Sequence, residues 1–99
     1  MTTLSVFANT DYRTGPNAAL VTGQNITTID FMTLSSAGAL FDASQFGGSN
    51  ISNSLHMLGG AQSDQVGVIM STPGTFSADN WTFTNWSSFD DNVAIYGTS

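Results

Sequence analysis

The sequence predicts an all-β fold, and three observations support this prediction. Only 8% of the 99 residues are charged, every acidic residue is Asp, and Glu and Lys are absent, so residues that favour surface helices are scarce. The 10 Gly residues, together with Asn, Ser and Asp, supply abundant turn chemistry. Short apolar runs of strand-forming residues alternate with these turn residues. A chain of this length is expected to form a single β domain, residues 1–99.

The N-terminal part, residues 1–25, is predicted to contain strands and a loop. Residues 4–8 form a short apolar run and are predicted as the first strand. Residues 9–17 contain Pro16 and are predicted as a loop, because their composition favours turns. Residues 18–22 are a second candidate strand before the next break in the apolar pattern.

The rest of the domain, residues 26–99, is predicted to consist of two imperfect repeats. The segments 41–46 and 76–81 share the order aromatic, polar, Ala, polar, polar, aromatic at an offset of about 35 residues. Each segment follows a glycine-containing turn, at residues 35–38 and 71–74. Strands are predicted before each turn and after each aromatic segment, at residues 26–34, 55–58, 66–70 and 93–96.

This repeat predicts a short parallel β-solenoid or β-roll with about 35-residue double-coil repeats. In such a fold Phe41 and Phe76 would lie above one another, as would Phe46 and Trp81, and the two pairs would fill a narrow core. The alternative interpretation is an antiparallel β-sandwich whose hairpins resemble one another.

The aromatic residues of the C-terminal part have a second interpretation. Trp81, Phe83, Trp86 and Phe89 would form a sugar-binding strip if they were exposed, because aromatic faces stack on sugar rings. Phe83 follows Trp81 at the period of a strand, so the two side chains share one face. Core packing is the favoured interpretation of that face.

Residues 59–67 read Gly-Gly-Ala-Gln-Ser-Asp-Gln-Val-Gly and resemble the glycine-rich nonapeptide of RTX-type calcium β-rolls, Gly-Gly-x-Gly-x-Asp-x-apolar-x. Gly59, Gly60, Asp64 and Val66 match this pattern, and Gln62 departs from it. The C-terminal residues, including the turn residue Gly97, are similar to the lead-in that precedes such repeats. The resemblance extends to the degenerate repeat regions of secreted bacterial RTX proteins. It implies a right-handed parallel β-roll, secretion, and calcium bound between successive turns.

The resemblance also implies which side chains would bind the metal. Calcium takes several oxygen ligands, which in a β-roll are carboxylates and backbone carbonyls of stacked turns. Asp64 belongs to the single nonapeptide, and Asp90 and Asp91 are candidates for a second turn. The alternative is that all three are solvated turn residues.

Several classes of function have no support in the sequence. A formal net charge of -6 argues against nucleic acid as a partner, and no apolar run approaches the length of a membrane span. The single His, His56, lies within a short predicted strand, and no Gly-x-Ser-x-Gly elbow or phosphate loop accompanies it. We therefore expect no enzymatic activity.

The sequence favours a non-enzymatic extracellular structural module that self-assembles, through strand edges or end to end, into a filament or surface layer. The expected partner is then another copy of the chain. One alternative is a calcium-responsive RTX-like module of a larger secreted toxin, adhesin or enzyme. A carbohydrate-binding β-sandwich using Trp81 and Trp86 is the other. The Lys-free composition, rich in Asn, Ser, Thr and Gly, associates the chain with secretion or the cell surface.

Overall fold

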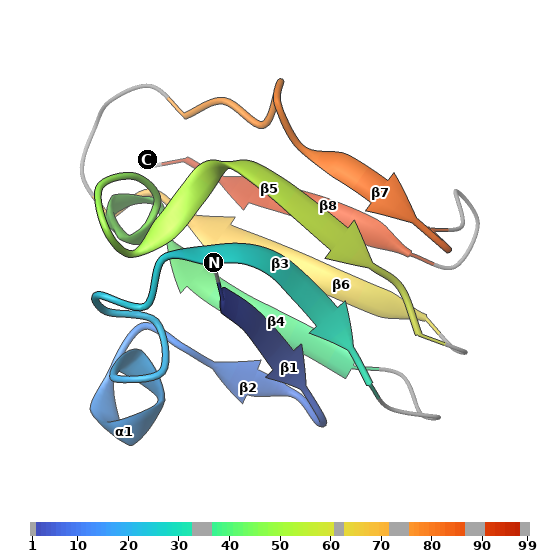
Figure 1. Ribbon diagram of the computed structural model, residues 1–99, viewed down its shortest axis with the longest axis horizontal. Helices are drawn as coiled ribbons and strands as arrows, with labels where there is room; N and C mark the ends of the chain where they lie inside the picture. Colours follow the sequence, from blue (N-terminus) through green and yellow to red (C-terminus); the bar gives the residue numbers. More distant parts are fainter. Residues whose placement is uncertain (1, 33–36, 61–62, 72–75, 87–90, 98–99) are drawn as a thin grey trace.

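The strands form two four-stranded parallel sheets (Figure 1). The computed structural model describes residues 2–32, 37–60, 63–71, 76–86 and 91–97. One sheet has the order β1-β3-β5-β7 and the other β2-β4-β6-β8, so the chain passes alternately from one sheet to the other. The strands are β1 (Thr2–Val6), β2 (Thr10–Asp11), β3 (Ile26–Phe31), β4 (Ala37–Asp42), β5 (Ile51–Leu58), β6 (Asp64–Ile69), β7 (Thr82–Thr84) and β8 (Asn92–Tyr96).

The all-β class predicted from the sequence is confirmed, and every strand pair in the described residues is parallel. The antiparallel hairpins of the sandwich alternative do not occur among these pairs. Figure 1 shows β1 and β2 at one end of the stack of strands and β7 and β8 at the other.

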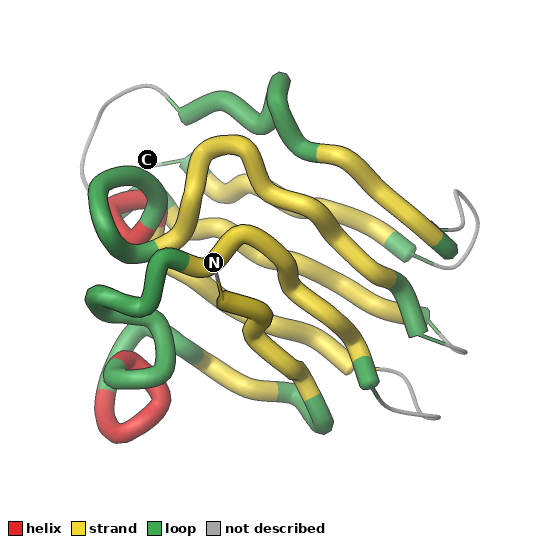
Figure 2. Tube along the Cα trace, in the orientation of Figure 1, coloured by secondary structure: helices red, strands yellow, loops and turns green. Residues whose placement is uncertain are grey.

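Two short helical segments, α1 (Gly15–Ala18) and η1 (Ala43–Gln45), lie on the same side of the molecule (Figure 2). α1 and the turn after it replace the strand predicted at residues 18–22. Pro16 favours the first turn of a helix, and the Thr22 amide donates to the Ala18 carbonyl. Val21 is fully buried, which explains the apolar run without a strand.

The predicted 35-residue repeat is wrong as the spacing of the strands. Gln65 pairs with Asn92 and Ala37 with Asp64, so neighbouring strands of this sheet are about 27 residues apart. In the other sheet His56 lies between Thr28 and Thr82, at similar separations. The turns predicted at residues 35–38 and 71–74 lie largely outside the described residues, and Gly38 belongs to β4.

The two aromatic segments resemble one another but occupy different places relative to the strands. Phe41 lies within β4 and pairs with Val68, whereas Phe76 lies in the connection between β6 and β7. Phe41 stacks on Tyr12 with ring centroids 5.2 Å apart, and not on Phe76 as the repeat predicted. The physical reason is that strand pairing fixes the register of β4 and β6, while the connections between strands differ in length.

The second predicted aromatic pair does come together. The rings of Phe46 and Trp81 are stacked, with centroids 5.6 Å apart and an interplanar angle of 25°. Phe76 packs edge-on against both rings. These connecting segments therefore add an aromatic cluster to the core between the sheets.

The core consists of side chains that repeat along the stack in rows. Leu4, Ile29, Met57 and Phe83 occupy successive positions in one sheet, where strand pairing places them opposite one another. In the other sheet the row of Phe41 continues through Val68 to Ile95. The inner strands bury these positions fully, as expected when alternate residues face a common interior.

Candidate functional site

Two Asp residues occupy equivalent positions at one side of the stack. Asp64 is the first residue of β6, and Asp91 immediately precedes β8. Because Gln65 pairs with Asn92, strand pairing places Asp64 beside Asp91. The two carboxyl groups are buried, with exposed fractions of 1% and 7%. The backbone amide of Asp64 donates a hydrogen bond of 2.7 Å to Oδ1 of Asp91.

The Asp64 carboxyl group is only partly satisfied by hydrogen bonds. Its Oδ2 accepts a 2.6 Å hydrogen bond from the Gly60 amide. Its Oδ1 is buried and has no hydrogen-bond partner. A buried polar atom without a partner costs stability, so a bound ligand or a proton on this oxygen would stabilise the folded chain.

Burial raises the pKa of the Asp64 carboxyl above its ordinary value, and the nearby Asp91 carboxylate raises the pKa further. The Gly60 amide opposes both effects, because its hydrogen bond favours the ionised form. A divalent cation would offset both the burial of the Asp64 carboxylate and its repulsion by the Asp91 carboxylate, since the cation replaces lost hydration and neutralises like charges.

The backbone carbonyl of Asn85 lies close to Gly59 and adds a further oxygen near Asp91. A Cβ atom on Gly59 would collide with the backbone carbonyl of Asn85 and would lie 3.5 Å from Oδ2 of Asp91. Asn85 itself adopts a left-handed backbone with φ of 55°, a conformation that Asn tolerates better than most residues. Gly59 therefore permits close approach of the next turn.

The sequence-predicted metal residues are brought together in part. Asp64 and Asp91 lie side by side, with Gly60 donating to Asp64, whereas Asp90 lies outside the described residues, as does Gln62. Gly97 follows β8 and is exposed, so it does not contribute to this turn. Across the described residues, no group of three or more His, Cys, Asp or Glu side chains has the arrangement of a metal site.

Two similar segments of the sequence predict this pairing. Residues 64–69 read Asp-Gln-Val-Gly-Val-Ile, and residues 91–96 read Asp-Asn-Val-Ala-Ile-Tyr. Aligning these segments gives the strand register directly and places Asp64 opposite Asp91. The role of Asn85 had no such signal, because only the folded chain brings its carbonyl to Gly59.

His56 is a hydrogen-bonded residue of the outer surface of the first sheet. Its Nδ1 lies 2.6 Å from the Thr82 hydroxyl, and its Nε2 lies 3.0 Å from the Thr84 hydroxyl. These contacts connect β5 to the edge strand β7. No described Asp carboxylate forms a hydrogen bond with the ring, so the described contacts do not form a Ser-His-Asp triad.

The C-terminal aromatic residues do not form a continuous exposed strip. Trp81 is buried against Phe46, and Trp86 is half-buried beside Phe31 and Phe83. Phe89 lies outside the described residues. Trp81 therefore does not present a free ring face to a sugar.

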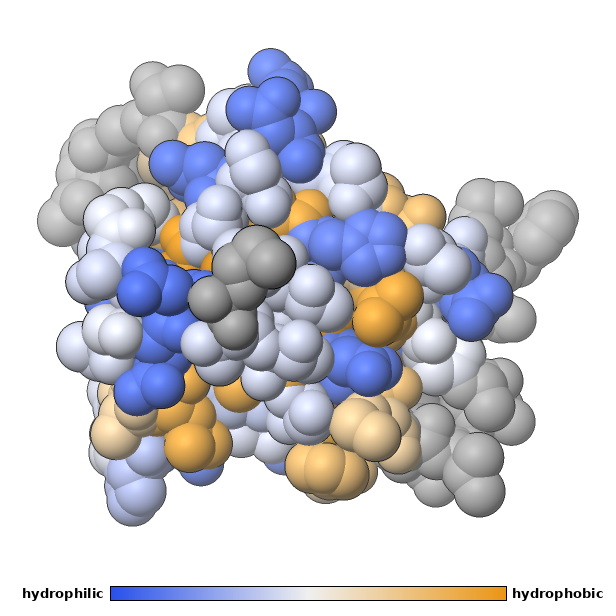
Figure 3. Space-filling model, in the orientation of Figure 1, coloured by the Kyte–Doolittle hydropathy of each residue, from blue (hydrophilic) through white to orange (hydrophobic). Residues whose placement is uncertain are grey.

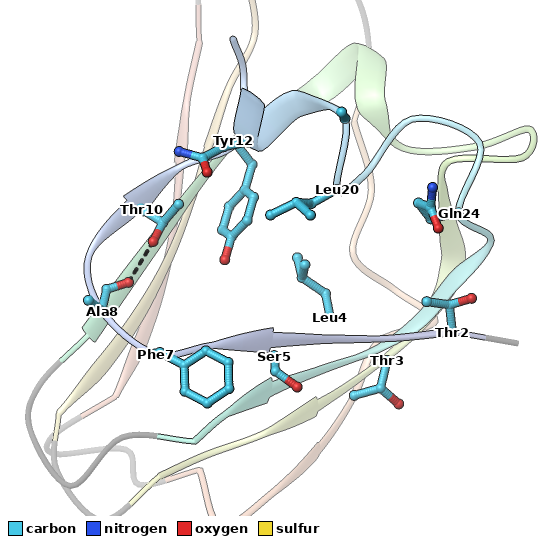
Figure 4. A pocket seen from close by; sticks show the side chains of 12 residues that line it. Thr2, Thr3, Leu4, Ser5, Phe7, Ala8, Thr10, Tyr12, Leu20 and Gln24 are labelled. Atoms are coloured by element: carbon cyan, nitrogen blue, oxygen red, sulfur yellow. Dashed lines mark hydrogen bonds between the residues drawn. The ribbon is translucent and has the colours of Figure 1, made fainter. Parts of the chain in front are cut away.

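The N-terminal end of the stack is hollow. A cavity of about 560 Å³ is lined by the first two strands and the segment after α1, and Figure 4 shows Leu4, Tyr12 and Leu20 pointing into it. Leu20 and Phe7 are exposed. Figure 3 shows apolar surface along this end, near α1 and the end of β1.

The C-terminal end also exposes apolar side chains. Phe83, Ile95 and Tyr96 are each more than two-fifths exposed, and they belong to the edge strands β7 and β8. Thus both ends of the stack combine apolar surface with strand edges that have no partner strand among the described residues.

Comparisons of the chain with protein-family models, curated proteins and solved structures find no match. Within the part of the chain that the structure describes, no helix is long and apolar enough to cross a membrane.

Proposed function

We propose that this chain is a non-enzymatic extracellular structural module, a short parallel β-solenoid that self-assembles through its ends. In this interpretation each pair of consecutive strands is one coil. The alternation of strands between two sheets and the near-constant separation of paired strands support it.

Open strand edges carry the proposal of self-assembly. β1 and β2 are the outermost strands at one end, and β7 and β8 are the outermost strands at the other. Each edge strand has one side without a partner strand among the described residues, and unpaired strand edges promote pairing with another chain. A second copy offers matching parallel edges in both sheets.

Sedimentation velocity and electron microscopy of the purified chain test self-assembly. We expect the average mass to rise with protein concentration, and filaments or layers to form at high concentration. The measurement is repeated in chelator and in calcium. A chain that remains monomeric at all concentrations under both conditions contradicts the proposal.

A calcium-responsive module of a larger secreted protein is the second candidate, and one observation favours it. Oδ1 of Asp64 is buried without a hydrogen-bond partner next to the Asp91 carboxylate. These two carboxylates would hold the cation, and the Asn85 carbonyl, which follows β7 and approaches Gly59, is a further oxygen nearby. The donor set is thus composed of the hard oxygen ligands that calcium prefers.

The calcium proposal predicts a gain of stability. Calcium at about 100 times its dissociation constant would stabilise the folded chain by about 2.7 kcal/mol. Melting in calcium is compared with melting in chelator for the natural chain and for Asp64→Asn. Asp79→Asn is the control, because Asp79 is exposed and lies outside this turn. An equal response of the natural chain and Asp64→Asn would exclude the Asp64 site.

A further inference from the structure

We propose that copies of the chain join head to tail, with the β7 and β8 end of one copy seated on the N-terminal hollow of the next. This inference rests on the proposed self-assembly and specifies its polarity and its two contact surfaces. β1 of the incoming copy would pair with β7, and its β2 with β8, so that both parallel sheets continue across the junction.

The C-terminal end exposes side chains that occupy core positions. Phe83 is the strand partner of Met57, and Ile95 is the strand partner of Val68. Met57 and Val68 are fully buried, whereas Phe83 is 43% exposed and Ile95 is 44% exposed. Phe83 and Ile95 therefore face the direction of the interior but lack the next coil that would cover them.

The N-terminal hollow provides the side chains that would continue the same rows. Leu4 begins the row that ends at Phe83. In the other sheet, the row of strand residues runs from Phe41 through Val68 to Ile95. Tyr12 stacks on Phe41 and so extends this row toward the N-terminal end. A second copy placed on the C-terminal end would continue the rows of Leu4 and Tyr12. Because Leu4 and Tyr12 are only 6% and 2% exposed, the side chain it would contact first in the hollow is the exposed Leu20.

Charge favours head-to-tail contact over contact between two C-terminal ends. Arg13, the one basic residue of the sequence, lies in the N-terminal coil and pairs with Asp11 at 2.9 Å. Asp30 and Asp42 lie on β3 and β4, which pair with β1 and β2, but within residues 1–25 the side-chain charges of Asp11 and Arg13 cancel. The C-terminal part instead contains Asp79, Asp90 and Asp91 and no basic Lys or Arg. Joining two C-terminal ends would bring acidic ends together and would also reverse the strand directions that parallel pairing requires.

The geometry of this contact leads to open-ended growth. The two surfaces differ from one another, so each added copy leaves one new C-terminal end and one N-terminal end free. Such heterologous contacts produce filaments unless a rotation closes them into a ring. The occupant of the hollow is thus a second copy of the chain.

Two variants, each with one of the two end surfaces altered, test the head-to-tail orientation of the contact. Phe83→Thr with Ile95→Thr removes the apolar side chains of the C-terminal end while keeping residues that suit edge strands. Leu20→Asp places a charge in the N-terminal hollow at an exposed position. We expect each variant to self-associate at least about tenfold more weakly than the natural chain, since each loses one of the two apolar surfaces.

Mixing the two variants is the decisive measurement. The double variant keeps its hollow and Leu20→Asp keeps its C-terminal end, so sedimentation of the mixture should reveal a one-to-one dimer that does not grow. Met32→Thr is the control, because Met32 is an exposed apolar residue that follows the inner strand β3. Its backbone amide donates to the Val6 carbonyl of β1, a bond that Thr retains, so this variant should assemble as the natural chain does. Circular dichroism confirms that each variant is folded.

The possible outcomes separate this inference from the proposed function. If the natural chain assembles and the double variant assembles equally well, head-to-tail contact is wrong while self-assembly stands. If Leu20→Asp alone still forms stable dimers and the mixture contains no dimer with one copy of each variant, the contact joins two C-terminal ends. If the natural chain is monomeric throughout, the proposed self-assembly itself fails.

Discussion

Asp64 combines features that are rarely found in a solvated turn residue. Its carboxyl group is 1% exposed, one oxygen accepts from the Gly60 amide, and the other oxygen has no partner. The sequence placed Asp64 and Asp91 in turns but left open whether they are solvated. Their burial depends on the neighbouring strand, because Asp91 covers Asp64 only when β6 and β8 pair.

The pKa shift of Asp64 predicts a pH dependence of stability with a definite sign. The folded chain holds the Asp64 proton to higher pH than the unfolded chain, because burial raises the pKa above 3.8. This group therefore lowers the free energy of unfolding as pH rises from about 4 through the raised pKa, and the loss persists at neutral pH. Asp64→Asn should remove that loss, since its side chain carries no charge and its oxygen can still accept from the Gly60 amide.

Urea unfolding in chelator, at a series of pH values, checks this prediction. The stability of Asp64→Asn relative to the natural chain should increase across the stated window. Asp11→Asn is a control of opposite sign, because hydrogen bonds from Arg13 lower the pKa of Asp11 and ionisation there favours folding. Parallel stability curves for Asp64→Asn and the natural chain would contradict the assignment.

At the scale of elements, the connections determine which parts of the strands meet. The Asp42 side chain accepts a hydrogen bond from the Ser44 amide at the start of η1, and the Gln45 side-chain oxygen accepts one from the Asp42 amide. This capping box fixes the direction in which the chain leaves β4. The connection then places Phe46 against Trp81, which lies in the connection between β6 and β7.

Gly59→Ala should destabilise the connection after β5. The added Cβ would collide with the Asn85 carbonyl, which is backbone and cannot move aside as a side chain would. We expect a loss of about 1–3 kcal/mol in the free energy of unfolding, as for other overpacked sites. Gly97→Ala is the matched control, because no atom lies within 4 Å of its Cβ position.

Chemical unfolding of both glycine variants measures the difference. Gly97→Ala should remain within about 0.5 kcal/mol of the natural chain, as exposed substitutions usually do. Equal stabilities of the two variants would show that the Asn85 carbonyl does not approach Gly59 closely.

At the scale of the whole molecule, parallel pairing brings together residues that are distant in sequence. Successive strands belong to opposite sheets, so each strand pairs with the next but one. The same arrangement leaves Phe83 and Ile95 uncovered at one end and a hollow at the other. The proposed self-assembly therefore depends on the residues at the two ends of the stack.

Spin labels at Gln65 and Asn92 test the register on which the solenoid proposal depends. Both side chains are exposed, and their strands are direct parallel partners. Their backbones should be about 4.8 Å apart, the spacing of adjacent strands, so continuous-wave spectra should show strong dipolar broadening. Labels at Gln65 and Thr10, two strands apart in the same sheet, should interact more weakly. Equal broadening in the two doubly labelled chains would contradict this register.

The all-β class could be predicted from the sequence alone, because turn residues and short apolar runs act locally. The sequence also pointed to Asp64, Asp90 and Asp91 as candidate calcium ligands, and the structure places Asp64 beside Asp91. It misplaced the repeat, since the similarity of residues 41–46 and 76–81 concerns segments that occupy different places relative to the strands. The fold itself was needed to show which residues lie above one another. Parallel pairing joins strands across long connections, and the similarity of residues 64–69 and 91–96 is weaker in the sequence than the misleading aromatic similarity.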